Sequence, residues 1–440
     1  MKTNRVAKNQ NMTYEGGRAA PAQKPEQELT RAVASCLLFE NTFYEKGSDI
    51  AVRIQALAAK CSAEFVSALA QKARQEWGLR HISLWLALDL VRRGGKIAAD
   101  TLDAVIQRAD EPAEFLAMYW REGRRPLSAQ LKKGLARAFR KFSAHSLAKY
   151  NRDGVVKLRD ALFLCHAKPK DEEQAATWKK LVDGTLESPD TWEVALSAGK
   201  DKRETWTRLL SEGKLGALAF LRNLRNMDAA KVDRALVEAY SRTVKWRGVL
   251  PWQFISAAKE APWAEPILEP SMLEGLNEHK KFAGRTGLLV DVSGSMKYAL
   301  SQKSDRTRLD AALALAILLR ETCESVEVCT FSEQFVLCPP RRGFALAETL
   351  AGSQPNQGTY LARALGVMQE QVRDLDRIIV VTDEQAHDGI SLCWTRYGYI
   401  VNVAPYKPAL DTSGGWVRIS GWSDRIPDWI LVHELEEAEN

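Results

Sequence analysis

Oxygen-bearing side chains follow two apolar runs in the C-terminal third of the chain. One run, residues 288–290, leads into an alternating carboxylate and hydroxyl pattern, and the other, residues 377–381, also ends in a carboxylate. The residues concerned are Asp291, Ser293, Ser295, Thr359 and Asp383. Hard divalent cations prefer such ligands, so we expect a site for Mg²⁺, with Mn²⁺ or Ca²⁺ as alternatives. The competing interpretation is a serine-rich turn at a strand end, unrelated to Asp383.

The elements around these residues alternate between strand and helix. Apolar runs predict strands, and apolar residues at spacings of three and four predict helices. The expected strands cover residues 288–291, 326–331, 334–337, 377–383 and 399–403, and the expected helices cover residues 308–321 and 360–370. This alternation predicts a doubly wound α/β sheet. Its parallel strands end at one edge, which would bring the five oxygen ligands together.

The preceding part of the chain shows a different pattern. From Pro25 to about Phe282 the spacing is helical almost throughout, with Gly, Pro, Asp or Ser every 10 to 20 residues. Many short amphipathic helices predict an α-solenoid of the HEAT kind. We therefore expect an α domain over residues 1–283 and an α/β domain over residues 284–440. The tryptophans of the first domain are interpreted as inter-helix core, and they include Trp85, Trp120, Trp192, Trp206 and Trp252.

Charge is divided unevenly between the two predicted domains. Residues 284–440 contain 15 Lys and Arg against 21 Asp and Glu, a net charge of −6. Subtraction from the chain totals of 62 and 56 leaves 47 and 35, so residues 1–283 carry +12. A strongly basic domain indicates a polyanionic partner.

Much of this charge lies on one predicted helix, residues 128–142. Its apolar stripe is Leu131, Leu135, Ala138, Phe139 and Phe142, and its opposite face carries Lys132, Lys133, Arg137, Arg140 and Lys141. The helix itself supplies no acid to pair with these cations, so phosphates are the expected counter-charge.

The cysteine pattern and the hydropathy indicate in which cellular compartment the protein is expected. The seven cysteines form no C-x-x-C pair, which argues against a disulfide framework and a zinc site. No apolar run approaches the length of a membrane span, and the N-terminus shows no apolar signal region. We therefore expect a cytoplasmic protein without a membrane partner.

The C-terminal pattern resembles a known metal site. Asp291-x-Ser293-x-Ser295, Thr359 and Asp383 are similar to the metal-ion-dependent adhesion site of von Willebrand factor A domains. The resemblance implies one Mg²⁺ held by three loops, with an acidic group of a partner completing its coordination. Gln357 departs from the pattern, since the family often has a second glycine there.

The N-terminal part resembles the TROVE module of the Ro autoantigen family. The similar stretches are Lys149-Tyr150-Asn151-Arg152-Asp153-Gly154, Leu164-Cys165-His166-Ala167-Lys168-Pro169, Ala219–Met227 and Leu250–Ile255. Cys165 stands where the family usually has serine. The resemblance implies a ring of helical repeats closed by the A domain, with small structured Y RNAs on the outer surface and single-stranded ends of misfolded RNA in a central hole.

The two resemblances together lead to an expected RNA interface. Positions carried over from the family are Lys149, Arg152, Arg159, His166 and Lys168. The basic helix adds Lys133, Arg137, Arg140 and Lys141 as electrostatic surface.

We expect a ribonucleoprotein scaffold in RNA quality control or processing. It would act as a monomer, with an exoribonuclease or another protein that offers a carboxylate as a further partner. The alternative is a metal-dependent protein-binding adaptor without RNA. An enzyme is the third possibility and ranks last, because the sequence shows no G-x-S-x-G elbow, S-x-x-K motif or P-loop.

Overall fold

The computed structural model describes residues 24–34, 47–246, 249–277, 279–300, 306–355, 357–404, 410–420 and 426–439. They form two compact units. The helical unit comprises residues 25–34 and 51–214, and the sheet unit holds the described residues from Leu215 onward.

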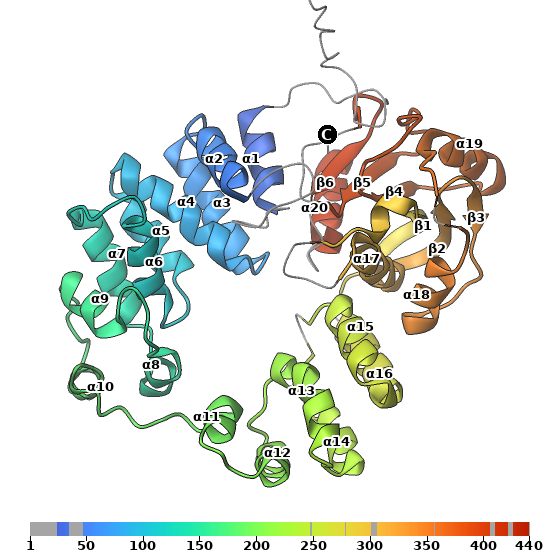
Figure 1. Ribbon diagram of the computed structural model, residues 1–440. Helices are drawn as coiled ribbons and strands as arrows, with labels where there is room; N and C mark the ends of the chain where they lie inside the picture. Colours follow the sequence, from blue (N-terminus) through green and yellow to red (C-terminus); the bar gives the residue numbers. More distant parts are fainter. Residues whose placement is uncertain are drawn as a thin grey trace, which may run out of the picture. The chain divides into compact units, whose positions relative to one another are not determined.

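The helical unit is a succession of short helices (Figure 1). They are α1 (Pro25–Ala34), α2 (Gly47–Ala58), α3 (Ala63–Gln75), α4 (Arg80–Arg93), α5 (Ile97–Val105), α6 (Glu111–Tyr119), α7 (Ala129–Phe139), α8 (Ala144–Tyr150), α9 (Leu158–Leu164), α10 (Glu172–Asp183), α11 (Trp192–Ser197) and α12 (Lys202–Ser211). Helices α3, α4 and α5 pack on one another, α5 packs on α7, and α6 and α7 pack on α9. The helical class expected for this part is confirmed.

Helix α7 lies close against α5. A Cβ atom added at Gly134 would stand 2.7 Å from the Cβ of Leu102 and 2.9 Å from the carbonyl oxygen of Ala99, so the absence of a side chain permits the contact. The predicted apolar stripe of this helix is buried as expected, at Leu131, Leu135, Ala138, Phe139 and Phe142. The packing therefore leaves the basic face of α7 pointing away from the core.

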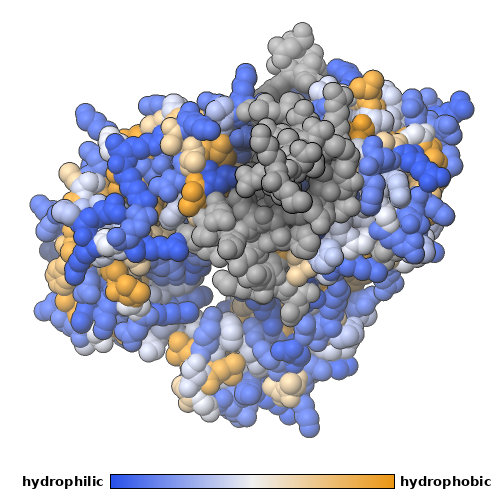
Figure 2. All heavy atoms as spheres, turned by 45° about the horizontal axis from the view of Figure 1, so that its top comes forward, coloured by the Kyte–Doolittle hydropathy of each residue, from blue (hydrophilic) through white to orange (hydrophobic). Residues whose placement is uncertain are grey.

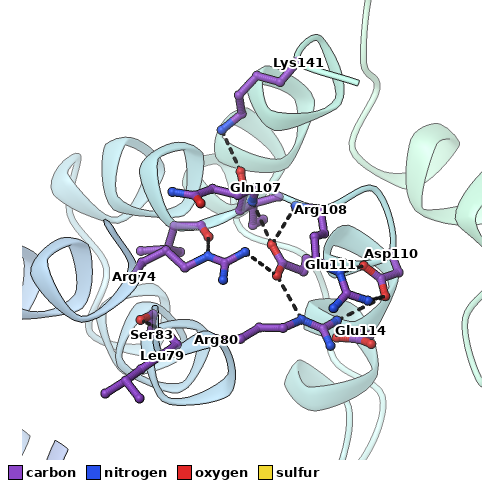
Figure 3. A network of polar contacts seen from close by, with 12 residues as sticks. Arg74, Leu79, Arg80, Ser83, Gln107, Arg108, Asp110, Glu111, Glu114 and Lys141 are labelled. Carbon is purple, nitrogen blue, oxygen red and sulfur yellow. Dashed lines mark hydrogen bonds and ion pairs between the residues drawn. The ribbon is translucent and has the colours of Figure 1, made fainter. Parts of the chain in front are cut away.

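A buried carboxylate braces the helices that precede α7 (Figure 3). Glu111 is fully buried, and its Oε1 accepts hydrogen bonds from Arg74 of α3 at 2.7 Å and Arg80 of α4 at 2.9 Å. Its Oε2 accepts from the backbone N–H groups of Gln107 at 2.7 Å and Arg108 at 3.0 Å. A buried charge is tolerated when it is paired and hydrogen-bonded in this way, so Glu111 ties α3 and α4 to the start of α6.

The interpretation of the tryptophans as core is confirmed only in part. Trp85 and Trp206 are buried, and the rings of Trp192 and Trp206 stack with centroids 5.7 Å apart. Trp120, Trp192 and Trp252 are half-buried. The half-buried Trp120 also lines a surface pocket.

The sheet unit contains one six-stranded sheet. Its strands are β1 (Phe282–Asp291), β2 (Cys323–Phe331), β3 (Phe335–Leu337), β4 (Arg377–Thr382), β5 (Tyr397–Asn402) and β6 (Val417–Ser420). The order is β3-β2-β1-β4-β5-β6, and only the β2–β3 pairing is antiparallel. Strands β1 and β4 are apolar and buried on both faces towards their carboxyl ends, as buried parallel strands require.

Eight α-helices belong to the described part of this unit. They are α13 (Ala217–Ala229), α14 (Arg234–Ser241), α15 (Pro251–Glu260), α16 (Glu265–Leu276), α17 (Arg308–Thr322), α18 (Gly343–Ala351), α19 (Leu361–Gln371) and α20 (Ile426–Glu439). Helix α19 packs on the face of Leu289, Ile378 and Ile400, whereas α17 packs on the opposite side against β1, β2 and β4. The doubly wound arrangement is confirmed.

The last helices before the sheet pack on the sheet unit itself. Helix α13 packs on α15, and α15 and α16 pack on α17. The sheet begins at Phe282, next to the predicted domain boundary between residues 283 and 284, which stays a prediction.

The C-terminal segment completes the sheet. Strand β6 pairs in parallel with β5, and Glu434 of α20 forms an ion pair with Arg377 of β4 at 2.6 Å. The extended segment thereby satisfies backbone groups along the edge of β5.

The surface face drawn in Figure 2 is mainly hydrophilic, with apolar side chains in small separate groups among the residues that are coloured. Within the described residues, none of the helices combines the length and the apolar character that crossing a membrane would need.

Candidate functional site

The predicted metal ligands lie at the sheet edge where the strand order reverses. Asp291 is the last residue of β1, and Asp383 directly follows β4. The two strands pair in parallel, and β2 continues the sheet on the other side of β1. The carboxyl ends of β1 and β4 therefore flank the crevice in which open α/β sheets bind ligands.

Hydrogen bonds shape the loop after β1. The backbone N–H of Ser293 donates to Asp291 Oδ1 over 2.9 Å, and the hydroxyl oxygens of Ser293 and Ser295 lie 3.2 Å apart. Asp291 and Ser293 are fully buried, whereas Ser295 is half-buried. The alternation seen in the sequence thus brings three oxygen-bearing side chains together.

Thr359 is tied to both neighbouring loops. The N–H of Gly294 donates to the carbonyl oxygen of Gln357 over 2.9 Å, which fixes the Thr359 loop beside the serines. The N–H of His387 donates to the carbonyl oxygen of Thr359 over 2.9 Å, which fixes it beside the loop after β4. The structure therefore gathers all five predicted metal ligands at one edge of the sheet.

The two carboxylates repel each other. Burial, together with the negative charge of Asp383, raises the pKa of Asp291 to about 7. Hydrogen bonds oppose this rise, and one of them comes from Thr382, whose hydroxyl donates to Asp291 Oδ2 over 2.6 Å. A cation placed between the carboxylates would relieve the repulsion.

Sequence reasoning missed Arg308, which is buried beside these acids. Its guanidinium forms an ion pair with Asp383 Oδ2 at 2.7 Å and donates to the carbonyl oxygen of Ser295 over 3.2 Å. Arg308 is the first residue of α17, where a positive charge faces the unfavourable end of the helix dipole. An arginine at the first position of a predicted helix could have indicated that an acid from another segment pairs with it.

The donor set fits a hard divalent cation. Two carboxylates lie near the hydroxyls of Ser293 and Ser295, Thr359 stands on the adjoining loop, and oxygen is the ligand that Mg²⁺ prefers. Within the described residues, no three His, Cys, Asp or Glu side chains are placed to share a metal ion. Metal binding at this edge would therefore depend on the hydroxyls of Ser293, Ser295 and Thr359 as well as on the carboxylates.

The basic face of α7 has partial counter-charge within the protein. Arg137 pairs with Asp100 at 2.6 Å, and Lys141 pairs with Asp103 at 3.0 Å, both acids lying on α5. The expectation that only phosphates would neutralise this face overlooked a neighbouring helix. Both cations keep more than a third of their side-chain surface exposed, so they stay available to solvent. Lys133 is exposed.

Three other predicted RNA residues, Arg140, His166 and Lys168, lie where α7 meets the end of α9, and Lys132, which was not among the predicted contacts, joins them. The Nζ of Lys132 lies 3.4 Å from Nε2 of His166, and the Nε–H of Arg140 donates to the carbonyl oxygen of Lys168 over 3.0 Å. His166 and Lys168 are exposed. The structure thus places four basic residues that are distant in sequence on one surface of the helical unit.

The remaining predicted contacts lie around α8 and α9. Lys149 is in the last turn of α8, with its Nζ 5.8 Å from the ring centroid of Tyr150. Arg152 follows in the exposed turn. Arg159 is exposed on α9, with its Nε 3.7 Å from a carboxylate oxygen of Asp160, a distance that implies a weak pair.

Family models match two segments of the chain. The TROVE domain matches residues 172–239, and the Ro60 vWA domain matches residues 285–392. None of the curated proteins gives a significant match to the sequence.

A solved structure supports the same assignment of fold. The crystal structure of the Deinococcus radiodurans RO (RSR) protein aligns with a TM-score of 0.61 at 18% sequence identity, covering 92% of this chain and 98% of that chain. The two family models match in the order TROVE and then A domain, so the chain contains segments similar to both domains, and the aligned structure shows the same fold over nearly the whole chain.

Proposed function

We propose that the chain is an RNA-binding scaffold that holds small structured non-coding RNA of the Y-RNA type on the basic surface of the helical unit. The meeting of α7 with the end of α9 carries this proposal, because Lys132 contacts the His166 ring there and Arg140 contacts the backbone of the exposed Lys168. Phosphates provide the counter-charge that such a surface favours, and structured RNA is recognised largely through its backbone geometry.

Single-stranded ends of misfolded RNA are the second ligand class that we propose, in a role in RNA quality control or processing. We also propose that the chain acts as a cytoplasmic monomer without enzymatic activity of its own. The family's ring, in which the A domain closes the helical repeats around a central hole, stays a prediction from resemblance.

The sheet edge is the proposed docking point for a protein. Asp291, Ser293, Ser295, Thr359 and Asp383 would hold Mg²⁺. When bound, the ion supplies a positive charge, and a carboxylate of a partner, for example an exoribonuclease, can complete its coordination. The chain contributes the hydroxyls and the hydrogen bond from Thr382 that orient the first carboxylate.

A salt series tests the RNA proposal. Fluorescence anisotropy with a labelled Y-type hairpin RNA, from about 50 to about 300 mM KCl, should show log affinity falling linearly with log salt. The double variant Lys133→Gln/Lys168→Gln should reduce the magnitude of this slope by roughly 2, because each lost phosphate contact removes about 0.9. Both side chains are exposed, so folding is spared.

The matched control is Arg242→Gln in the sheet unit, which removes one exposed charge outside the proposed interface. It should leave the slope unchanged. A flat salt response of the wild-type chain would exclude the electrostatic interface, and in that case a protein-binding adaptor without RNA would become the better interpretation.

Metal binding is tested by thermal unfolding in EDTA and in Mg²⁺. The wild-type chain should gain stability with Mg²⁺, and Asp291→Asn should remove that gain, because stabilisation by a ligand follows its affinity for the folded state. Glu324→Gln is the control, since this acid is exposed at the opposite end of β2. An equal Mg²⁺ response in wild type and Asp291→Asn would exclude the site.

A further inference from the structure

The helical unit contains a surface pocket that the sequence did not suggest. Its volume is about 750 Å³, which lies within the range of 300 to 1,000 Å³ typical of sites for small ligands. It is lined by the end of α6, the following loop, α7 and the end of α9, through Trp120, Arg124, Arg125, Pro126, Leu127, Lys132, Phe163, Leu164 and His166.

Two aromatic rings give the pocket flat surfaces. Phe163 is 60% exposed, an unfavourable state for a large apolar ring that no neighbour covers fully. Trp120 is half-buried, and its indole N–H donates to the carbonyl oxygen of Arg125 over 2.8 Å, which anchors the ring. Exposed rings of this kind are the platforms on which unpaired bases stack.

Cations surround the rings. The guanidinium of Arg124 lies 5.1 Å from the ring centroid of Trp120, and within the described residues no acid lies at ion-pair distance from Arg124 or Lys132. Arg125 differs, because it pairs with Glu122 at 3.2 Å.

Lys132 and His166 form the second basic element of the pocket. Lys132 Nζ lies 3.4 Å from His166 Nε2, a hydrogen bond that the ammonium group can donate to the ring nitrogen. His166 also has a backbone φ of 54°, in the left-handed region that non-glycine residues rarely adopt. The pair therefore places one ammonium group and one imidazole N–H or N side by side at the wall of the pocket, where both can contact an anion.

We infer that this pocket holds an unpaired nucleobase of the bound RNA, stacked on Phe163 and Trp120, while Lys132 and His166 contact the adjacent phosphate. The inference rests on the proposed RNA-binding function. A double helix cannot present this ligand, because its bases stay stacked on one another. The pocket therefore selects RNA with a single-stranded tail next to its helical part.

An acidic peptide is the competing occupant. Its carboxylates would meet Arg124 and Lys132, but they would leave the exposed Phe163 ring without a flat partner. A nucleotide complements both the Phe163 ring and the cations, because its base is planar and aromatic and its phosphate is anionic. The combination of an exposed ring with unpaired cations thus favours RNA.

The test compares two RNAs on two variants. One RNA is a blunt hairpin, and the other is the same hairpin with a short single-stranded 3′ tail that contains 2-aminopurine. Phe163→Leu keeps an apolar side chain at an exposed position and removes the aromatic face. It should weaken binding of the tailed hairpin about ten-fold, leave the blunt hairpin unchanged and leave the salt slope of both unchanged.

The fluorescence of 2-aminopurine reports stacking directly. Wild-type protein should quench it, and Phe163→Leu should restore most of the signal. Arg124→Gln provides a second, independent variant, which should weaken the tailed hairpin more than the blunt one. Val155→Ala is the matched control, because Val155 is 95% exposed and lies outside the pocket. It should change nothing.

The outcomes separate this inference from the proposed function. If the wild-type chain binds both hairpins with a salt-dependent affinity but Phe163→Leu affects them equally or not at all, the pocket inference is wrong and RNA binding stands. If neither hairpin binds, both fail. If a glutamate-rich peptide displaces the single-stranded tail, and Phe163→Leu weakens the peptide as much as it weakens the tailed hairpin, the pocket binds peptide and this inference is wrong.

Discussion

Two buried acids of this chain, Glu111 and Asp291, show opposite ways of accommodating a carboxylate. Glu111 is surrounded by two guanidinium groups and two backbone N–H groups that belong to the helical unit itself. Asp291 lies beside a second carboxylate, Asp383. One guanidinium, that of Arg308, forms an ion pair with Asp383.

The difference separates a brace from a binding site. Where the chain supplies the full counter-charge, as around Glu111, a buried acid connects helices and offers nothing to a ligand. Where two acids lie close together among hydroxyls with less positive charge around them, an added cation would neutralise them, as proposed above for Asp291 and Asp383. Variants of the two sites can test whether this distinction holds.

The largest effect is expected for Glu111→Gln. It leaves the largely buried Arg74 guanidinium without its carboxylate and removes one of the three acids that pair with Arg80, so it should destabilise the helical unit by about 3 kcal/mol. Urea unfolding followed by far-ultraviolet circular dichroism measures this loss. Glu114→Gln is the control, since its side chain is 38% exposed and pairs with Arg80 alone in the network, so its cost should stay within about 1 kcal/mol. Equal costs would mean that Glu111 is no brace.

Arg308→Met comes second and should behave differently in EDTA and in Mg²⁺. Without metal it exposes two buried acids to each other and should cost about 2 to 3 kcal/mol. Mg²⁺ should restore more stability to this variant than it adds to the wild-type chain, because the site becomes more negative. Thermal unfolding with and without Mg²⁺ gives both values.

Arg418→Met is the matched control for that experiment. Arg418 pairs at 2.7 Å with Glu384, the buried acid directly after Asp383, which also accepts hydrogen bonds from Asn402 at 2.8 Å and from the N–H of Leu410 at 3.0 Å. In EDTA, Arg418→Met should lose a similar amount of stability to Arg308→Met, but Mg²⁺ should not restore that stability. Equal rescue of both variants would refute the distinction between the two neighbouring acids.

Thr382→Val should have a smaller effect. It removes a 2.6 Å hydrogen bond to the Asp291 carboxyl while nearly conserving side-chain volume, and should cost about 1.5 kcal/mol. Chemical denaturation in EDTA tests the value. A loss below about 0.5 kcal/mol would show that the hydroxyl contributes little to holding Asp291.

The smallest effect is expected for an exposed acid, Asp100→Asn. Its partner Arg137 is partly exposed, and pairs of this kind contribute less than about 1 kcal/mol. The variant should change unfolding little, yet it should strengthen RNA binding slightly in the anisotropy assay, because Arg137 loses its protein counter-charge. Weaker RNA binding would argue against a role of α7 in the interface.

The sheet could be predicted because its strands carry their own signal. Buried parallel strands such as β1 and β4 are continuous apolar runs, and the acids at their ends mark the same edge. Helix α18 was not predicted from the sequence. It is only nine residues long and follows a Pro-Pro pair, so its apolar spacing extends over too few residues to indicate a helix. Its position against α17 follows from tertiary packing instead.

Partners of charged residues could not be predicted in the same way. Arg308 and Asp383 are 75 positions apart, and Arg137 and Asp100 are 37 apart, so no local spacing links them. The helix of residues 128–142 looked unpaired because its acids lie on α5. The pocket was missed for a related reason, since it joins Trp120 and Phe163 from separate helices.

The pairing of β1 with β4 has a consequence for the order in which the chain would assemble the proposed metal site. Thr382 reaches Asp291 across 91 positions, and the intervening stretch includes α17, β2, β3, α18 and α19. Contacts of such high sequence separation form late, because the loop between them must be closed first. A nascent or partly folded chain therefore presents its serines without the second carboxylate, and cation capture would report that synthesis and folding have passed β4.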